Sequence, residues 1–276
     1  MYMEDLTRED IKRYLLALHR LDVTNRTVAN RIGYVQTFLL LQKCGELLTV
    51  KDKPKFTKRA PNAYNQSFLA RLFAACDAED QLAFQFFLGS GAREQEVMYA
   101  CWPDIDFIHG TFRITEKADL GWTLKDYEER TIPLPTDLLN ALTTRRKERP
   151  KDRFLFPTKA GKPEGHFLRR LKRVALRAGL NCGHCRSKKS LSCRTHPVCG
   201  HVELHRFRRT FATLHHEAGR AIKKLQTWLG HSDIETTLQY LANSEDQTSE
   251  IRDAVDRVFR SVHAPTVDAS RCVANL

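Results

Sequence analysis

Residues 205–241 read HRFRRTFATLHHEAGRAIKKLQTWLGHSDIETTLQYL and carry the clearest folding pattern in the chain. Their apolar residues recur at helical spacing in three consecutive runs, over 205–218, 221–229 and 234–241. Gly230 falls at a turn between the last two runs, and Ser232 or Asp233 can cap the third helix. The stretch therefore predicts three short helices in succession.

Most of the chain on either side of this stretch has the same periodicity. Helical patterns are predicted over 66–76, 81–88, 93–100, 136–147, 165–177 and 246–262. Strand signals are few and short: 112–115 and 130–134 flank a loop containing Gly121 and predict a hairpin, and 154–156 predicts a third strand. We therefore expect a mainly α-helical domain with one small β-sheet, an α+β fold.

The first 50 residues hold only two helical patterns. Thr7 and Asp10 form a capping-box-like start for a helix over 11–18, and a second pattern covers 28–39. The next stretch, 51–61, reads KDKPKFTKRAP and has the prolines, dense lysine and lack of periodicity of an extended basic linker. The predicted division is thus a short helical segment over 1–50, a linker over 51–61 and a large domain over 62–276.

The composition is that of a folded protein outside the membrane. Of the 276 residues, 42% are hydrophobic and 28% are charged, and there is no low-complexity tract. The sequence has no run of about 18 apolar residues, and Met1–Asp5 lack the basic and apolar regions of a signal peptide. We therefore expect a cytoplasmic protein that neither spans a membrane nor is secreted.

Positive charge is concentrated in one part of the chain. The net charge is +12, and residues 145–209 alone contain 20 basic and 4 acidic residues, a local net charge of +16. The segments before and after each have a net charge of −2. Such a field suits a polyanion such as nucleic acid, and a solvated basic face is the alternative.

Three short motifs follow one another in the large domain. GAREQE over 91–96 opens one helix, HRFR over 205–208 opens another, and LGH over 229–231 is followed nine positions after its histidine by Tyr240. This arrangement resembles the tyrosine recombinase, or phage integrase, family over residues 61–262. The resemblance implies an integrase-like DNA breaking and rejoining domain. It also implies a preceding helical core-binding domain, of which 1–50 would be a reduced or truncated form.

The residue types in these motifs fit the cleavage of a phosphodiester. Attack at phosphorus adds negative charge to the nonbridging oxygens, which the guanidinium groups of Arg93 and Arg208 can clamp. His205 lies one helical turn before Arg208 and can donate to the phosphate or handle a proton, and His231 would donate a further hydrogen bond. Tyr240 would be the nucleophile, because the surrounding cations favour its phenolate.

The departing 5′-oxygen needs a proton, and family members take it from a lysine in the hairpin. Lys117, at the end of the first hairpin strand, is our choice because of its distance from Arg93, and Lys125 in the loop is the alternative. We expect Glu96 to support Arg93 or the helix rather than to react, because an acidic base would repel the phosphate.

The resemblance implies a site-specific recombinase that cuts and rejoins double-stranded DNA through a 3′-phosphotyrosine, without ATP, cofactor or catalytic metal. Its partners would be paired recombination sites and three further copies of the chain in a tetramer. Its role would be integration, excision or resolution of mobile DNA at a bacterial nucleoid. The alternatives are a type IB topoisomerase-like relaxase, an inactive DNA-binding remnant and a zinc-dependent nuclease.

Four cysteines crowd into an insertion over 182–201 that the minimal family pattern lacks. Two close pairs joined by a short loop are typical of structural zinc, although iron or a softer metal also fits such ligands. The four are Cys182, Cys185, Cys193 and Cys199, with His184, His196 and His201 as alternative ligands. We expect bound Zn²⁺ to order a basic loop that holds Arg186, Lys188, Lys189 and Arg194; a reduced, metal-free loop is the alternative.

Overall fold

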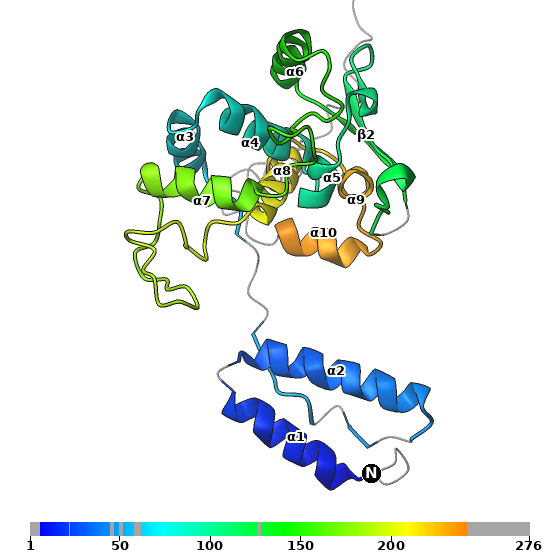
Figure 1. Ribbon diagram of the computed structural model, residues 1–276. Coiled ribbons are helices and arrows are strands. Elements are labelled where there is room, and N and C mark those ends of the chain that lie inside the picture. Colours follow the sequence, from blue (N-terminus) through cyan, green and yellow to red (C-terminus); the bar gives the residue numbers. More distant parts are fainter. Residues whose placement is uncertain are drawn as a thin grey trace, which may run out of the picture. The chain divides into compact units, whose positions relative to one another are not determined.

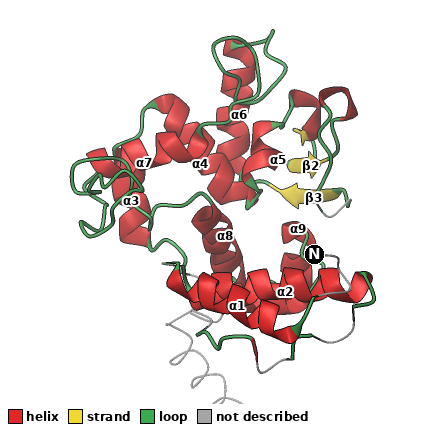
Figure 2. Ribbon diagram, turned by 60° about the horizontal axis from the view of Figure 1, so that its bottom comes forward, coloured by secondary structure: helices red, strands yellow, loops and turns green. Residues whose placement is uncertain are grey.

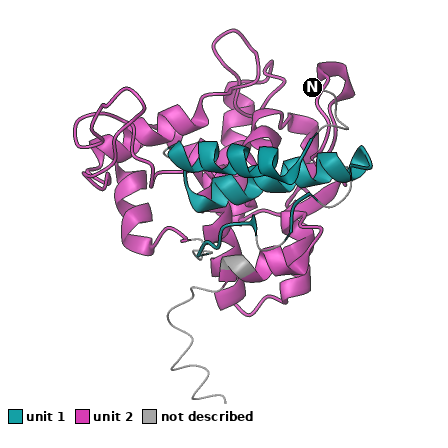
Figure 3. Ribbon diagram, turned by 90° about the horizontal axis from the view of Figure 1, so that it is seen from below, with its two compact units in different colours: residues 1–59 teal, residues 60–276 magenta. Residues whose placement is uncertain are grey.

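A computed structural model describes residues 6–21, 23–44, 47–49, 52–57, 62–125 and 128–241, with only the backbone of residues 239 and 240. The chain forms two compact units, Met1–Arg59 and Ala60–Leu276 (Figure 3). The division falls at the end of the stretch that we interpret as a linker. The helical pattern over 246–262 lies outside the described residues.

The first unit contains two helices, α1 (Arg8–Arg20) and α2 (Asn25–Leu41), which pack against each other. Thr7 and Asp10 form a complete capping box at the start of α1: each side chain accepts the other residue's backbone N–H. A small separate core lies between the helices and contains Ile11, Leu18, Val28, Ile32, Leu39 and Leu48. The two helices predicted for this segment are therefore confirmed.

The second unit is mainly helical and contains one small sheet (Figures 1 and 2). Its α-helices are α3 (Gln66–Ala74), α4 (Ala78–Ser90), α5 (Glu94–Met98), α6 (Thr136–Glu148), α7 (Phe167–Arg177), α8 (His205–Glu217), α9 (Ile222–Leu229) and α10 (Ile234–Leu241). Single 3₁₀ turns follow α5 and interrupt the hairpin loop, at Trp102–Asp104 and Ala118–Leu120. The predicted fold class is confirmed.

Helix α4 is the centre of this unit, because its neighbours cover it on several sides. It packs against α6, α7 and α8, and its apolar residues are buried all around the helix rather than along one stripe. Phe84, Phe86 and Phe87 of α4 contact the rings of Phe112, Phe156, Phe167 and Phe207. The end of α4 therefore has a fixed position, and the first motif begins there.

The sheet is an antiparallel ribbon of three strands, β1 (Ile105–Asp106), β2 (Thr111–Ile114) and β3 (Arg130–Pro133), in that order. Phe112 pairs with Ile105 on one side and with Ile132 on the other. The predicted hairpin is therefore present. Strand β3 also packs against α9, so the sheet reaches the last helices of the unit.

The strand predicted over 154–156 is wrong. Phe154 forms only an isolated bridge with Cys101, and the third strand of the sheet is Ile105–Asp106. Phe154, Leu155 and Phe156 are all buried in the core. An apolar run this short cannot by itself distinguish a strand from an irregular core segment, which explains the error.

Within the described residues, no helix combines the length and the apolar character that crossing a bilayer requires.

Candidate functional site

The first motif turns the chain sharply at the end of α4. Gly91 has a left-handed conformation (φ 60°, ψ 15°), and its N–H donates to the carbonyl of Phe87. A Cβ at this position would lie 2.6 Å from Cδ1 of Phe211 on α8. Gly91 therefore permits both the turn and the close approach of α8, and Arg93 follows it at the start of α5.

Arg93 and Arg208 meet at the turn that ends α9. Nη2 of Arg93 donates to the carbonyl of Gly230 at 2.8 Å. Arg208, only 1% exposed, donates from Nη1 to the carbonyl of Gly91 at 2.9 Å and from Nη2 to the carbonyl of Leu229. Two guanidinium groups that are 115 residues apart in sequence thus contact adjacent carbonyls.

Glu96 is a buried carboxylate close to both arginines. It accepts the backbone N–H of Arg93 at 2.7 Å and Nη1 of the same residue at 3.1 Å. The Arg130 guanidinium donates to Glu96 at 2.6 Å. Glu96 is buried, which favours its neutral form, but Arg130, Arg93 and Arg208 outweigh that effect and lower its pKa. Glu96 is therefore an ionised support for Arg93, as expected.

Arg130 is a site residue that the sequence did not reveal. Its Nε donates to the carbonyl of Trp228 at 2.9 Å, and its pair with Glu96 is 5% and 4% exposed. A Cβ on Gly230 would lie 3.1 Å from the Arg130 side chain. The available signal was a charged residue that opens an otherwise apolar strand, RTIPL over 130–134. That signal does not say which partners the charge has.

His205 and His231 border the two arginines. His205 is the first residue of α8, and Nδ1 of His231 lies 2.9 Å from Oγ1 of Thr237 on α10. Desolvation by the surrounding protein, followed by the charges of Arg208 and other nearby cations, lowers the pKa of His205 to about 4 and that of His231 to about 3. Both rings are therefore neutral near pH 7, when each carries one N–H and one acceptor nitrogen.

The backbone of Tyr240 lies in α10, which packs against α8 and α9. Asp233 stabilises the start of α10 by accepting the N–H of Glu235 at 2.9 Å. The elements that carry His205, Arg208, His231 and Tyr240 are thus direct neighbours. The approach of the phenol itself to the arginines stays a prediction, because the side chain lies outside the described atoms.

The two candidate lysines have different surroundings. Nζ of Lys117 donates to Asp104 at 2.8 Å and to the hydroxyl of Thr115 at 2.6 Å, in an ion pair that is 10% and 9% exposed. Lys125 is one of the cations that lower the pKa of His205. The structure therefore pairs Lys117 with Asp104, which precedes β1, and brings the charge of Lys125 within electrostatic reach of His205.

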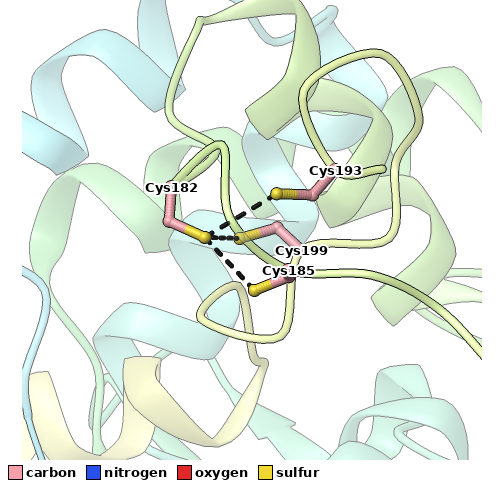
Figure 4. A group of neighbouring side chains, drawn as sticks. All are labelled: Cys182, Cys185, Cys193 and Cys199. Atoms are coloured by element: carbon pink, nitrogen blue, oxygen red, sulfur yellow. Dashed lines mark hydrogen bonds between the residues drawn. The ribbon is translucent and has the colours of Figure 1, made fainter. Parts of the chain in front are cut away.

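The four predicted cysteine ligands converge between α7 and α8 (Figure 4). Sγ of Cys182 lies 3.2 Å from that of Cys185 and 3.7 Å from those of Cys193 and Cys199, and all four sulfurs are within 4.8 Å of one another. Four Zn–S bonds of about 2.3 Å in a tetrahedron require sulfur separations of about 3.8 Å. The set therefore fits a tetrahedral metal ion.

The surroundings of the sulfurs favour a thiolate at Cys182. Backbone N–H groups of His184 and Gly200 donate to Cys182 and Cys185, each at 3.4 Å. The N–H of His184 lowers the pKa of Cys182 to about 6, whereas the hydrogen bond with Cys182 raises that of Cys185 to about 11. Cys193 and Cys199 are fully buried in the core. None of the alternative histidine ligands belongs to the group among the described residues.

Comparison with known proteins gives one consistent result. Residues 64–247 match the phage integrase family. Tyrosine recombinase XerC from Oceanobacillus iheyensis is 25% identical over 261 residues, which cover 90% of this chain and 80% of the relative. XerC from Chlamydia pneumoniae is 24% identical over 253 residues, with coverage of 85% and 73%.

Several solved structures with the same fold are complexes with DNA. The Tn1549 transposon integrase bound to transposon right end DNA has a TM-score of 0.67 and 19% identity, and the match covers 94% of this chain and 87% of that one. The XerH site-specific recombinase bound to its difH substrate has a TM-score of 0.60 and 18% identity, with coverage of 91% and 71%.

The lowered histidine pKa values predict that acid destabilises the second unit. The ordinary pKa of histidine is 6.5. Below this pH the unfolded chain binds protons at His205 and His231, whereas in the folded chain both rings stay neutral. The free energy of unfolding should therefore fall between pH 6.5 and pH 5, and His231→Gln should remove about 1 kcal/mol of that loss, an amount reduced for solvent screening.

Urea denaturation at both pH values measures this effect, and tryptophan fluorescence reports on the second unit alone, because Trp102, Trp122 and Trp228 all lie in it. An equal loss in His231→Gln and in the unmodified chain would contradict the assignment.

Proposed function

The chain belongs to the phage integrase family and is a DNA-cleaving and rejoining tyrosine recombinase, and we propose that Arg93, Arg208, His205, His231 and Tyr240 form its active site. The observation that carries this proposal is the meeting of both guanidinium groups at the carbonyls of residues 229 and 230. The two histidines border the same turn. The site would bind one scissile phosphate.

In the proposed reaction the phenolic oxygen of Tyr240 attacks phosphorus. A bond forms between that oxygen and phosphorus, the bond from phosphorus to the 5′-oxygen breaks, and the DNA keeps a 3′-phosphotyrosine linkage. The charge that develops on the nonbridging oxygens would meet the forks of Arg93 and Arg208. The free 5′-hydroxyl of a second strand reverses the step, so that rejoining needs no ATP.

The neutral histidines suit this chemistry. A ring with a pKa of about 3 or 4 adds no net charge to the site near pH 7, but it still donates a hydrogen bond through its N–H. For His231, the contact between Nδ1 and Thr237 fixes the ring orientation. The other nitrogen, Nε2, is then the atom that would face the phosphate.

We favour Lys125 over Lys117 as the donor of the proton to the 5′-oxygen. Lys117 was our expectation, but its ammonium is engaged by Asp104 and Thr115 in a nearly closed setting. The charge of Lys125 acts on His205, which lies in the proposed site. A lysine close to that histidine is the better candidate for a group that must reach the leaving oxygen.

The partners we propose follow from the family and from the charge distribution. The net charge of +16 over residues 145–209 would bind the phosphate backbone of double-stranded DNA. We propose paired recombination sites on a tetramer of this chain. We also propose that the first unit is a short core-binding domain, and that the enzyme integrates, excises or resolves a mobile element in the bacterial cytoplasm.

We further propose that the four cysteines hold a structural Zn²⁺. Four thiolates at tetrahedral spacing favour zinc over harder divalent ions, and the ligands lie in the chain segment that precedes α8. The ion would stabilise that segment, and strand cleavage by a tyrosine would not require it.

Tyr240→Phe should abolish the covalent link to DNA. The substrate is a duplex with a nick beside the proposed cleavage point, made from the junction of the element that encodes the protein. The unmodified chain should accumulate a protein–DNA adduct that survives denaturation, and the variant should bind the duplex without forming one. An adduct of undiminished yield in Tyr240→Phe would refute the nucleophile, and Tyr34→Phe in the first unit is the matched control.

Lys125→Ala should slow cleavage by about 10² to 10⁴, and a substrate with sulfur in place of the bridging 5′-oxygen should restore the rate. A thiolate departs without protonation, so only loss of the general acid is rescued. Lys117→Ala should show no such rescue, because its contacts are structural. Rescue confined to Lys117→Ala would reverse the assignment.

The purified protein should contain about one zinc ion per chain by elemental analysis. Cys182→Ser together with Cys185→Ser should remove the ion, because these residues supply half of the ligand set. Cys76→Ser, a cysteine outside the cluster, should leave the content unchanged. If neither the unmodified chain nor the Cys76 variant contained zinc, the zinc proposal would be contradicted.

A further inference from the structure

The cysteine cluster anchors the base of a short hairpin, residues 185–193, which we call the cysteine-anchored hairpin. The N–H of Cys193 donates to the carbonyl of Cys185 at 2.9 Å. Arg186 and Ser192 form the next antiparallel bridge, and the N–H of Ser187 donates to the carbonyl of Leu191 at 3.0 Å. The first rung therefore consists of two of the four metal-ligand candidates.

The tip of the hairpin is closed by its own hydrogen bonds. The N–H of Ser190 donates to the carbonyl of Ser187 at 2.9 Å, and the Ser187 hydroxyl accepts the N–H groups of Lys189 and Leu191 at 3.3 and 3.2 Å. Ser190 takes a left-handed conformation (φ 58°) to complete the turn. Lys188 and Lys189 are the middle residues of this turn, and both are exposed.

The hairpin cations differ from several arginines of the basic segment that form ion pairs. Arg145, Arg153 and Arg170 form ion pairs with carboxylates of the same unit. Within the described residues, no carboxylate lies within 4.0 Å of Lys188 or Lys189 in an ion pair, and the same holds for Arg186. The positive charge at the tip is therefore not used to hold the fold together.

The remaining cation of the insertion has a different position. A Cβ on Gly183 would lie 3.9 Å from the guanidinium of Arg194, so this side chain lies beside the loop between Cys182 and Cys185. Four thiolates with Zn²⁺ would carry a net charge of −2, which a nearby arginine offsets. Arg194 thus lies near the cluster, whereas Lys188 and Lys189 lie at the tip of the hairpin.

We propose that the cysteine-anchored hairpin contacts the phosphate backbone of duplex DNA through Lys188 and Lys189. The proposal rests on the proposed function, because it extends the DNA contact of the same catalytic unit. Lys188 is three residue steps from Cys185, so the tip stands up to about 10 Å from the cluster. The chain continues from Cys199 directly to His205 at the start of α8. The hairpin would therefore bind phosphates beside the scissile one.

The residue types at the tip favour DNA over a protein partner. Lysine is depleted in protein–protein interfaces, which are enriched in aromatic residues, methionine and arginine. The tip over 187–191 reads SKKSL and contains none of those enriched residues. It offers two serines and two ammonium groups, which are donors that phosphate oxygens accept without regard to base sequence.

The test is the salt dependence of binding to a duplex of about 40 base pairs of random sequence, for which phosphate contacts supply the affinity. Lys188→Ala with Lys189→Ala should reduce the slope of log K against log salt by about 2. Between about 50 and 200 mM salt, the unmodified chain should therefore lose roughly ten-fold more affinity than the variant. Lys188→Arg with Lys189→Arg should keep the original slope.

The matched control is Lys223→Ala with Lys224→Ala, which removes two exposed lysines of α9, outside the basic segment over 145–209. Its slope should stay that of the unmodified chain. An unchanged slope in the Lys188 and Lys189 variant overturns the proposal, and so does an equal change in the control. A changed sedimentation coefficient without DNA would instead assign the hairpin to contact between copies of the chain.

Two further measurements keep the outcomes separate. Zinc content and the unfolding midpoint identify a variant whose hairpin has collapsed, and the arginine variant then decides the question with its charge intact. Adduct formation on the nicked duplex tests the proposed function independently. If the unmodified chain forms the adduct and the slope does not change in the alanine variant, only the hairpin contact fails.

Discussion

Several cations can share the small volume around residues 229 and 230 only if the protein supplies compensating negative charge. It does so in two ways. Glu96 binds Arg93 and Arg130 directly, and Arg208 donates to carbonyls at the ends of α4 and α9, where helix dipoles place partial negative charge. Because Arg208 is almost wholly buried, loss of either kind of compensation would leave an unpaired charge in the core. The cations can therefore lie close together only when the turn at Gly230 and Glu96 are both in place.

The same arrangement explains how the site can be ready for an anion before one arrives. In the folded chain, hydrogen bonds hold both guanidinium groups in fixed orientations and offset the repulsion between them. His205 adds the N-terminal end of α8, where the helix dipole favours negative charge. Neutral imidazoles keep the repulsion among these groups low. A phosphate would therefore meet positively charged groups that are already fixed in place.

Sequence reasoning reached the motif residues because helical spacing is local. Three positions separate His205 from Arg208, and this spacing alone places both on one face. Arg130 could not be found in this way, because its partner Glu96 is 34 positions away and the contact depends on how β3 packs beside α5. The sequence likewise leaves the choice between Lys117 and Lys125 open, because the path of the hairpin loop after Lys117 cannot be read from residue spacing. The error at 154–156 arose because buried apolar runs have no periodicity to read.

The cysteine-rich loop over 182–201 lies between α7 and α8 in the chain. Its return to α8 is fixed by contacts outside the cluster: the hydroxyl of Tyr64 both accepts from and donates to the backbone of Glu203 at 2.9 Å. Arg206 stacks on the Tyr64 ring and donates to the carbonyls of Ala63 and His201. These contacts hold the start of α8 whether or not a metal is bound. Ligation of the proposed metal by Cys193 and Cys199, which are buried in the core, would instead stabilise the loop itself, a segment too short to bury a core of its own. The two tasks would therefore be separate, so that a bound metal would organise the hairpin without taking part in the proposed chemistry at His205.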